Sequence, residues 1–191
     1  MTRSVLIAGG LVVLLLSGLS ARDSRFVPQN SRLNPDHAEI YAFLERFHGH
    51  TCPGSLMGLR LGMAAKDALK GSGKLKAKCF ILACPVDGIQ VGAGTTYGNK
   101  ALEVEDRNEL RLILTDVESG RQVEARLTQK AEEMGKSFRD LSGKARSSAP
   151  GSPERLRFEK ERDAALDWFR TAPDSEVVTI RTLEHEETRA E

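Results

Sequence analysis

Two histidines and a cysteine stand close together in the segment FHGHTCPG, residues 47–54, and could bind a metal ion. His48, His50 and Cys52 are each separated from the next by one residue. Imidazole and thiolate groups together suit Zn²⁺ or another borderline divalent metal. The alternative is structural: the histidines would cap helix ends, and Cys52 would be a small apolar contact.

The backbone decides whether these three side chains can share one ion. In a helix, residues two apart point in nearly opposite directions, whereas in an extended segment they point the same way. A shared site therefore requires the preceding helix to end near Phe47. Gly49 favours that ending, because glycine lets the chain leave a helix and straighten.

Cys52 has a second chemical possibility. A helix is predicted over residues 52–69, with Thr51 as its cap and Pro53 near its first position. The unpaired N–H groups and the dipole at that end of a helix favour a thiolate. Cys52 could therefore be a metal ligand or a nucleophile.

A row of glycines follows in the same helix. Gly54, Gly58 and Gly62 recur every four residues and line one side of it. Each costs roughly 1 kcal/mol relative to alanine, so another backbone or a ligand should approach that side closely. The pattern leaves helix packing and ligand contact both open.

The other two cysteines lie in the apolar run LKAKCFILACP, residues 75–85, which predicts a buried strand ending at Pro85. Cys79 and Cys84 are an odd number of residues apart, so a regular strand places them on opposite faces. They are not expected to share a site. Cys79 is predicted to be a core residue, because free cysteine is commonly buried.

The remaining elements predict an α+β fold, with N-terminal helices packed on a mainly antiparallel sheet. Asn34 is expected to cap the first helix, and Asp87 to cap a short helix starting near Gly88. A glycine loop, a β-hairpin, two helices and a final strand follow. Their predicted ranges are 92–98, 108–127, 128–141, 155–169 and 176–183, with a flexible Ser/Gly/Pro loop over 142–154.

The 191 residues also divide into a leader, a linker, one domain and a tail. Residues 1–20 join a basic start to a short apolar run, which is typical of a cleaved export signal. An uncleaved membrane anchor is the alternative. Residues 21–33 are a polar linker, 34–183 the domain and 184–191 an acidic tail. We therefore expect an exported protein, periplasmic or extracellular, that meets a membrane only through an uncleaved leader.

Composition and motifs exclude several other functions. The net charge is +1 and aromatic residues make up 5% of the chain, so no nucleic-acid partner is expected. The sequence has no Walker loop, dinucleotide glycine fingerprint, nucleophile-elbow serine or Cys-x-x-Cys motif.

Three segments together resemble the FmdE family, which takes its name from a component of formylmethanofuran dehydrogenase. They are FHGHTCPG, the glycine-spaced LMGLRLGMAA and ACPVDGIQVGAGTTYGN, and the hairpin LRLILTDVESGRQVEARL is also similar. The resemblance spans about residues 37–183 and implies an α+β core, usually a homodimer, with a metal-binding cleft. By matching motif, the cleft residues are His48, His50, Cys52, Cys84, Asp87, Gln90, Thr96 and Asn99.

The chain departs from the family pattern in three ways. Family members typically have a cysteine in the glycine loop, and Thr95 stands there in this chain. The C-terminal cysteine-rich zinc finger of some relatives is absent from the sequence. A leader is also unexpected for the partner of a cytoplasmic molybdenum or tungsten enzyme. The resemblance therefore does not imply a part in methanogenesis.

Three hypotheses follow for the function. The first is an exported metal-binding protein whose ion is most readily zinc, with nickel, cobalt or iron as alternatives. The second is a thiol-redox protein that pairs Cys52 with Cys84, and the third is a non-catalytic, homodimeric partner subunit. In the first, Asp87 would be a general base or would orient a ligating imidazole. The predicted metal ligands are His48, His50, Cys52 and Cys84, and the predicted ligand-contacting residues are Gln90, Thr96 and Asn99.

Overall fold

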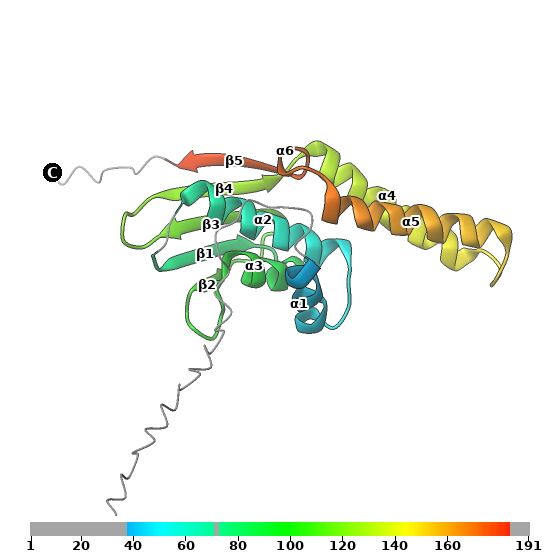
Figure 1. The fold of residues 1–191 in the computed structure, drawn as a ribbon, viewed down its shortest axis with the longest axis horizontal. Helices are drawn as coiled ribbons and strands as arrows, with labels where there is room; N and C mark the ends of the chain where they lie inside the picture. Colours follow the sequence, from blue (N-terminus) through cyan, green and yellow to red (C-terminus); the bar gives the residue numbers. More distant parts are fainter. Residues whose placement is uncertain (1–37, 71–72, 184–191) are drawn as a thin grey trace, which may run out of the picture.

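The computed structural model describes residues 38–70 and 73–183, which form helices and one five-stranded sheet (Figure 1). The helices are α1 (Ala38–His48), α2 (Pro53–Leu69), α3 (Pro85–Ala93), α4 (Gln129–Ser147), α5 (Pro153–Thr171) and α6 (Asp174–Val177). The strands are β1 (Leu75–Phe80), β2 (Leu102–Val104), β3 (Glu109–Asp116), β4 (Gln122–Leu127) and β5 (Val178–Leu183). The predicted leader, linker, Asn34 cap and acidic tail lie outside the described residues.

The sheet has the strand order β2-β1-β3-β4-β5. Only the β1–β2 pair is parallel, so the predicted α+β fold with a mainly antiparallel sheet is confirmed. The predicted hairpin is also confirmed, with Leu112 opposite Ala125 and Leu114 opposite Val123. The prediction missed β2, which is three residues long. No helix in the described part of the chain has the length and apolar character needed to cross a membrane.

α2 is the central helix of the core. It packs against α3 and against β3 and β4, so the N-terminal helices cover one face of the sheet as predicted. Leu56, Leu59 and Leu61 of α2 are almost completely buried. Cys79 on β1 is also fully buried in this core, which confirms its predicted place.

The glycine row of α2 is a helix–helix contact. A Cβ added at Gly58 would lie 2.0 Å from the carbonyl oxygen of Pro85, and one added at Gly88 would lie 2.0 Å from that of Ser55. No side chain can be accommodated at these separations, so glycine is what allows α2 and α3 to approach this closely. Of the two neighbours that the glycine spacing left open, a backbone or a ligand, the structure has the backbone of α3.

The boundaries around Cys84 differ from the prediction. β1 ends at Phe80, and α3 begins at Pro85 rather than near Gly88. Proline cannot donate to a strand ladder, and its fixed φ suits the first position of a helix. Cys84 occupies the N-cap position and Asp87 lies in the first turn of α3. The regular strand through Cys84 and the capping role of Asp87 were therefore wrong.

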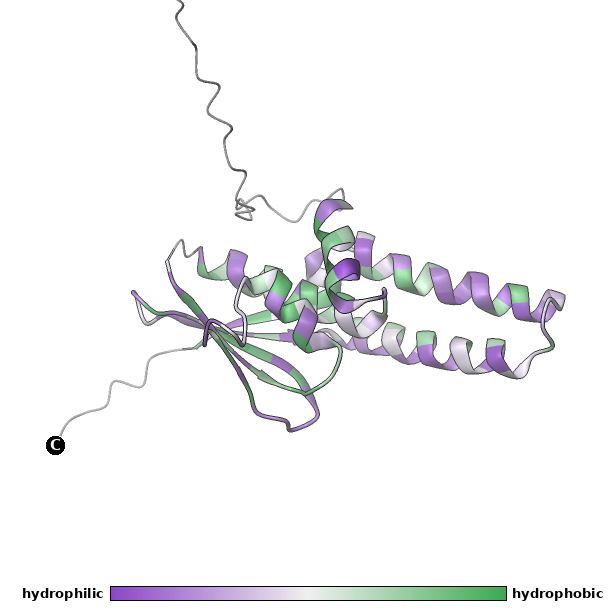
Figure 2. Ribbon diagram, turned by 90° about the horizontal axis from the view of Figure 1, so that it is seen from below, coloured by the Kyte–Doolittle hydropathy of each residue, from purple (hydrophilic) through white to green (hydrophobic). Residues whose placement is uncertain are grey.

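α4 and α5 form a helical hairpin that extends away from the sheet (Figure 1). Most of the flexible loop predicted over 142–154 is helical, because α4 continues to Ser147 and α5 begins at Pro153. The Ser152 hydroxyl caps α5 by accepting from the backbone N–H of Arg155. Mostly hydrophilic residues cover both helices (Figure 2).

Arg60 ties the base of this hairpin to α2. Its side chain is buried, and its guanidinium donates to the carbonyl oxygens of Phe169 and Ala172 and to the carboxylate of Asp174. The last carbonyl groups of a helix have no partner within the helix, and the buried Arg60 guanidinium donates to two of those at the end of α5. α2 therefore positions the hairpin through Arg60 near its middle and Cys52 at its N-terminal end.

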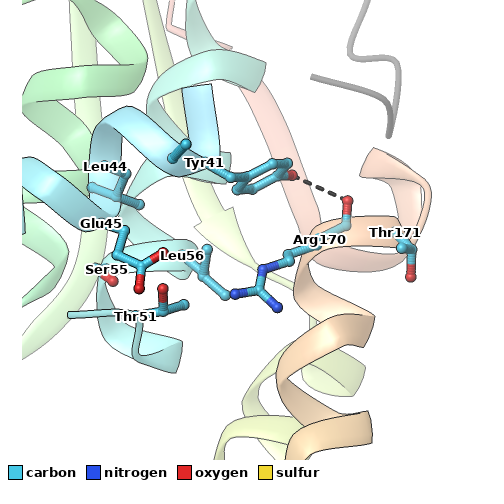
Figure 3. Close-up of a pocket in the computed structure, with 9 residues that line it drawn as sticks. Tyr41, Leu44, Glu45, Thr51, Ser55, Leu56, Arg170 and Thr171 are labelled. Carbon is cyan, nitrogen blue, oxygen red and sulfur yellow. Dashed lines mark hydrogen bonds between the residues drawn. The ribbon is translucent and has the colours of Figure 1, made fainter. Parts of the chain in front are cut away.

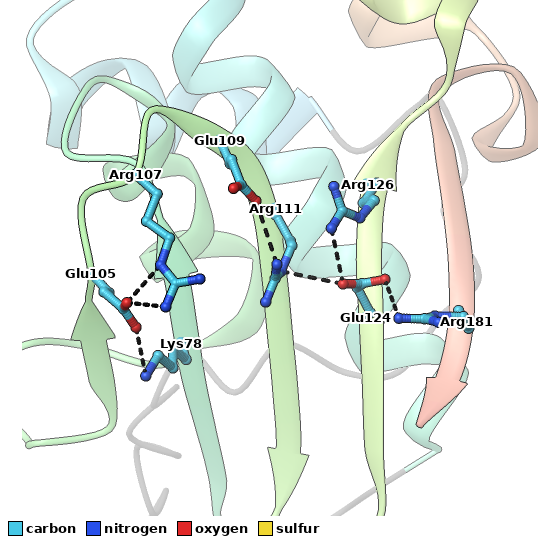
Figure 4. A network of polar contacts seen from close by, with 8 residues as sticks. All are labelled: Lys78, Glu105, Arg107, Glu109, Arg111, Glu124, Arg126 and Arg181. Carbon is cyan, nitrogen blue, oxygen red and sulfur yellow. Dashed lines mark hydrogen bonds and ion pairs between the residues drawn. The ribbon is translucent and has the colours of Figure 1, made fainter. Parts of the chain in front are cut away.

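The sheet face opposite the helices carries an ion-pair network around Glu124 (Figure 4). The Glu124 carboxylate lies 3.2 Å from Arg111, 3.3 Å from Arg126 and 3.0 Å from Arg181. Burial acts to raise the pKa of Glu124, but the three guanidinium groups outweigh it and hold that pKa below its usual range. Ionised Glu124 therefore stabilises the folded state.

We expect the substitution Glu124→Gln to destabilise the protein in a pH-dependent way. A carboxyl group with a depressed folded-state pKa contributes stability above its unfolded pKa of about 4.3 and loses it as the pH falls through the folded value. Urea unfolding should show a loss of roughly 1–3 kcal/mol at neutral pH, shrinking below about pH 4. Glu103→Gln, at a largely exposed ion pair with Lys78, is the control and should change little. A Glu124→Gln loss that is independent of pH would contradict this account.

Candidate metal centre

Three helix ends bring one histidine and two cysteines together. His48 is the last residue of α1, Cys52 is the N-cap of α2 and Cys84 is the N-cap of α3. Their ligating atoms all lie within 4.8 Å of one another, and all three residues are half-buried. Two of these helices are held together by the glycine contact described above, so the packing of α2 on α3 sets the separation of Cys52 and Cys84.

The turn at Gly49 creates the His48–Cys52 contact. Gly49 has φ = +86°, a left-handed conformation that reverses the chain after α1. His48 stays helical, so the extended segment predicted through His48, His50 and Cys52 was wrong. Instead, His48 Nε2 and Cys52 Sγ lie 3.6 Å apart. The exposed ring of His50 lies beside that of His48, with 4.6 Å between centroids, and is not part of the three-residue group.

Cys52 and Ser55 cap the start of α2 reciprocally. The Ser55 N–H donates to Cys52 Sγ, and the Cys52 N–H donates to Ser55 Oγ, both at 3.4 Å. This is the arrangement of a capping box, with cysteine in place of serine or threonine. Cys52 is therefore the cap, not Thr51 as predicted. The prediction missed Ser55, because the sequence signal of a capping box is Ser or Thr followed three positions later by Glu or Gln, and Cys52 with Ser55 does not match it.

The surroundings make Cys52 the more acidic of the two site thiols. Burial acts to raise the pKa of Cys52, but hydrogen bonds from Ser55 and His48 outweigh it and lower that pKa below its usual range. Burial and the neighbouring Cys52 raise the pKa of Cys84. The hydrogen bond to Asp87 raises the pKa of His48, and Cys52 adds to the effect. Without a metal, the site thus favours a thiolate at Cys52 beside a protonated His48.

Asp87 orients the imidazole of His48. Its Oδ2 lies 2.7 Å from His48 Nδ1. Because an ionised carboxylate only accepts hydrogen bonds, Nδ1 carries the proton and Nε2 is the ring atom left for a ligand. A carboxylate that binds the far nitrogen of a ligating histidine is the usual outer partner in metal sites. Of the two roles predicted for Asp87, this geometry favours orientation over general base catalysis.

Within the described part of the chain, Gln90 of α3 connects the glycine loop to the site. Thr96 and Asn99 bond to each other within the loop, each donating its backbone N–H to the other's side-chain oxygen. Both are exposed. The Gln90 side chain joins the site to the loop: it donates to Asp87 Oδ1 and accepts from the backbone N–H of Tyr97. The structure therefore places Gln90 beside the site, and Thr96 and Asn99 in the turn of the loop.

Thr95 lies at the far end of α3 from Cys84. The nine residues of α3 separate its two ends by about 13 Å. Thr95 is buried, and its hydroxyl has no hydrogen-bond partner among the described residues. A cysteine at this position would not reach the His48–Cys52–Cys84 group within one chain.

The chemistry of the three residues suits a zinc-like ion. Tetrahedral ligands at bond lengths of about 2.0–2.3 Å lie roughly 3.3–3.8 Å apart. Separations within 4.8 Å therefore require only small movements to hold an ion. A cation also favours two thiolates, which would otherwise repel each other. The carboxylate of Asp87, which orients the histidine ligand, is already in place.

A cavity of about 360 Å³ lies next to this group, between α1, the start of α2 and the end of α5 (Figure 3). Leu44 and Leu56 form part of its apolar lining, and the Tyr41 hydroxyl bonds the carbonyl oxygen of Arg170 beside it. Ser55 is shared with the capping box, but none of the three candidate ligands lines the cavity. The cavity is a neighbour of the candidate site rather than part of it.

Fold and site together define a class: an α+β domain with a His/Cys/Cys group at the meeting point of three helix ends. The family model described as "FmdE, Molybdenum formylmethanofuran dehydrogenase operon" matches residues 47–179. The chain belongs to the FmdE family, as its sequence motifs predicted.

Solved structures support the same relationship, and three of their chains match. One is the 1.90 Å crystal structure of an FmdE-like protein from Syntrophus aciditrophicus, named after a tungsten formylmethanofuran dehydrogenase. It is 25% identical, with a TM-score of 0.51, and the match covers 78% of this chain and 72% of that one. No curated protein matches the chain.

Proposed function

We propose that this protein is an exported metal-binding protein of the FmdE family, with His48, Cys52 and Cys84 as the ligands of one divalent transition metal. The observation that carries the proposal is the convergence of these three ligating atoms within 4.8 Å. The nitrogen and sulfur donors favour zinc, with nickel, cobalt or iron as alternatives.

The residues around the ligands prepare them for a cation. Asp87 holds the proton of His48 on Nδ1, so Nε2 is presented as a neutral ligand. The N–H of Ser55 stabilises negative charge on Cys52 Sγ. When bound, zinc with three protein ligands and one open position supplies an activated water or a Lewis acid. If a fourth protein ligand filled the open position, the site would be structural.

Elemental analysis of the mature protein tests the proposal. The chain from Ala21 onward, produced with export intact and purified without chelator, should contain about one transition-metal ion per chain. Metal-free protein should bind zinc again with the same stoichiometry. A folded protein that neither contains metal nor takes up zinc in a titration would overturn the proposal.

Replacing Asp87 with asparagine should weaken metal binding without abolishing it. Asparagine can still accept from His48 Nδ1, but the charge that makes the imidazole a better ligand is lost. Removal of an outer partner of a ligating histidine lowers metal affinity by about 10–100-fold. A competition titration against a chromophoric chelator should show that loss with an unchanged stoichiometry. Equal affinity in both proteins would show that the charge of Asp87 contributes nothing to metal binding.

A second candidate function is thiol-disulfide exchange between Cys52 and Cys84. The observation in its favour is the proximity of the two sulfur atoms, together with a lowered pKa at Cys52 and a raised one at Cys84. Thiol counting separates the two functions. Three free thiols, of which zinc protects those of Cys52 and Cys84 from alkylation, support the metal site. One free thiol and a 52–84 bridge support exchange.

Export and homodimer formation remain part of the proposal on sequence grounds. The leader over residues 1–20 motivates export, and membership of the family motivates a homodimer. Mass spectrometry of the secreted fraction would detect cleavage before Ala21. Light scattering of the purified protein would report a mass of two chains if the homodimer forms, and of one chain if it does not.

A further inference from the structure

Gln90 links the metal-site group to the loop that follows α3. Its side-chain Nε2 lies 3.3 Å from Asp87 Oδ1, and its Oε1 lies 3.2 Å from the backbone nitrogen of Tyr97. Asp87 in turn holds His48, and His48 faces Cys52. We propose that Gln90 is a positioning residue that fixes Asp87, and through it His48, in the orientation that binds metal.

The direction of these hydrogen bonds is determined by their end groups. The backbone N–H of Tyr97 can only donate, so the Gln90 oxygen must face it. The Gln90 amide nitrogen then faces Asp87, whose ionised carboxylate can only accept. The two contacts agree on one orientation of the amide, and that agreement distinguishes Gln90 from a side chain free to flip.

Gln90 completes the coordination of the Asp87 carboxylate. Asp87 Oδ2 accepts from His48 and Oδ1 accepts from Gln90, so both oxygens are held. A carboxylate held at one oxygen can rotate about χ2, whereas one held at both cannot without breaking a bond. The imidazole of His48 is only as well oriented as the carboxylate that binds it.

The loop gives Gln90 a firm anchor. Thr96 and Asn99 close it with two reciprocal hydrogen bonds, and Asn99 also accepts from the backbone N–H of Ala101. The N–H of Tyr97, between them, is therefore fixed in place while its side chain is 72% exposed. Thr96 and Asn99, which the family resemblance assigned to the cleft, act on the site through this anchor.

A double-mutant cycle on the full chain tests this inference, which rests on the proposed metal site. Gln90→Ala should lower zinc affinity about threefold to tenfold, at or below the usual effect of a direct outer partner. If Gln90 acts through Asp87, the same substitution in an Asp87→Ala background should change the affinity by less than about twofold. Gln90→Glu, which keeps the Tyr97 bond but faces Asp87 with a like charge, should lower it further.

Gln122→Ala is the matched control, because Gln122 donates a comparable bond to Thr115 on the sheet. It should leave zinc affinity unchanged. Equal losses from Gln90→Ala in both backgrounds, or no loss in either, would overturn the positioning role.

A second readout does not depend on metal. In the metal-free protein, at a pH high enough for the His48 ring to be neutral, ¹⁵N NMR should show a single Nδ1-protonated tautomer, and Gln90→Ala should convert it to a mixture. An unchanged tautomer would count against Gln90 even if zinc binds. Failure of the wild-type chain to bind zinc would overturn the proposed function, while the tautomer would still decide the role of Gln90.

Discussion

Replacement of Cys52 with serine should remove the metal and leave the fold intact. Serine is a strong N-cap residue, so it can still accept from the backbone N–H of Ser55 and satisfy the start of α2. Its hydroxyl is a poor ligand for zinc beside thiolate and imidazole. Zinc affinity should therefore fall by more than the roughly 10–100-fold that follows loss of an outer partner. The free energy of unfolding should change by less than about 0.5 kcal/mol.

Cys79→Ala should give the opposite pattern. Cys79 is fully buried on β1 and is outside the site group, so its truncation should cost about 1 kcal/mol of stability and leave zinc binding unchanged. Chelator competition and urea unfolding of the metal-free proteins measure the two effects separately. Undiminished zinc affinity in Cys52→Ser would show that Cys52 serves the helix alone and is not a ligand.

The sequence was informative wherever a pattern is local. The two alternating runs around residues 118–121 predicted the β3–β4 hairpin, and Leu112 and Leu114 of β3 are buried in the core. The four-residue glycine spacing likewise predicted the close approach of a backbone or a ligand to α2, and the backbone of α3 is that neighbour. Both patterns depend on the spacing of residue types within one helix or one hairpin, and that spacing can be read from the sequence.

The site geometry could not be predicted because it depends on where helices end. Extending α1 by one residue, to His48, changes the partner of His48 from a residue two positions away to Cys52, four positions away. A boundary error of one or two residues is ordinary, yet here it decides which side chains can share an ion. The same holds for α3, whose start at Pro85 releases Asp87 from capping and turns it toward His48.

Long-range pairing was the other limit. The bond from His48 to Asp87 joins residues 39 positions apart, and only the packing of α1, α2 and α3 brings them together. The matching motifs of the family named Asp87 and Gln90, and the sequence left two roles open for Asp87. The hydrogen bonds from His48 and Gln90 to the two oxygens of Asp87 are what favour the proposed positioning roles.

A second large effect is expected from Gly58→Ala. The added methyl group would lie 2.0 Å from the carbonyl oxygen of Pro85 and 2.7 Å from its Cα, so α3 must move away from α2. Backbone cannot yield as a flexible side chain does, and overpacking of this kind costs about 3 kcal/mol at the upper end of its usual range. Urea unfolding of the metal-free protein should show that loss.

The same substitution should also weaken the site, because Pro85 directly follows Cys84 and α3 carries Asp87. Displacing the start of α3 moves one ligand and the carboxylate that orients another, so zinc affinity should fall together with stability. Gly143→Ala is the control: this glycine lies within α4, nothing lies within 4 Å of its added Cβ, and the change should stabilise the helix by up to about 1 kcal/mol. If Gly58→Ala were destabilised yet bound zinc as tightly as the wild type, the α2–α3 contact would support the core without setting the metal site.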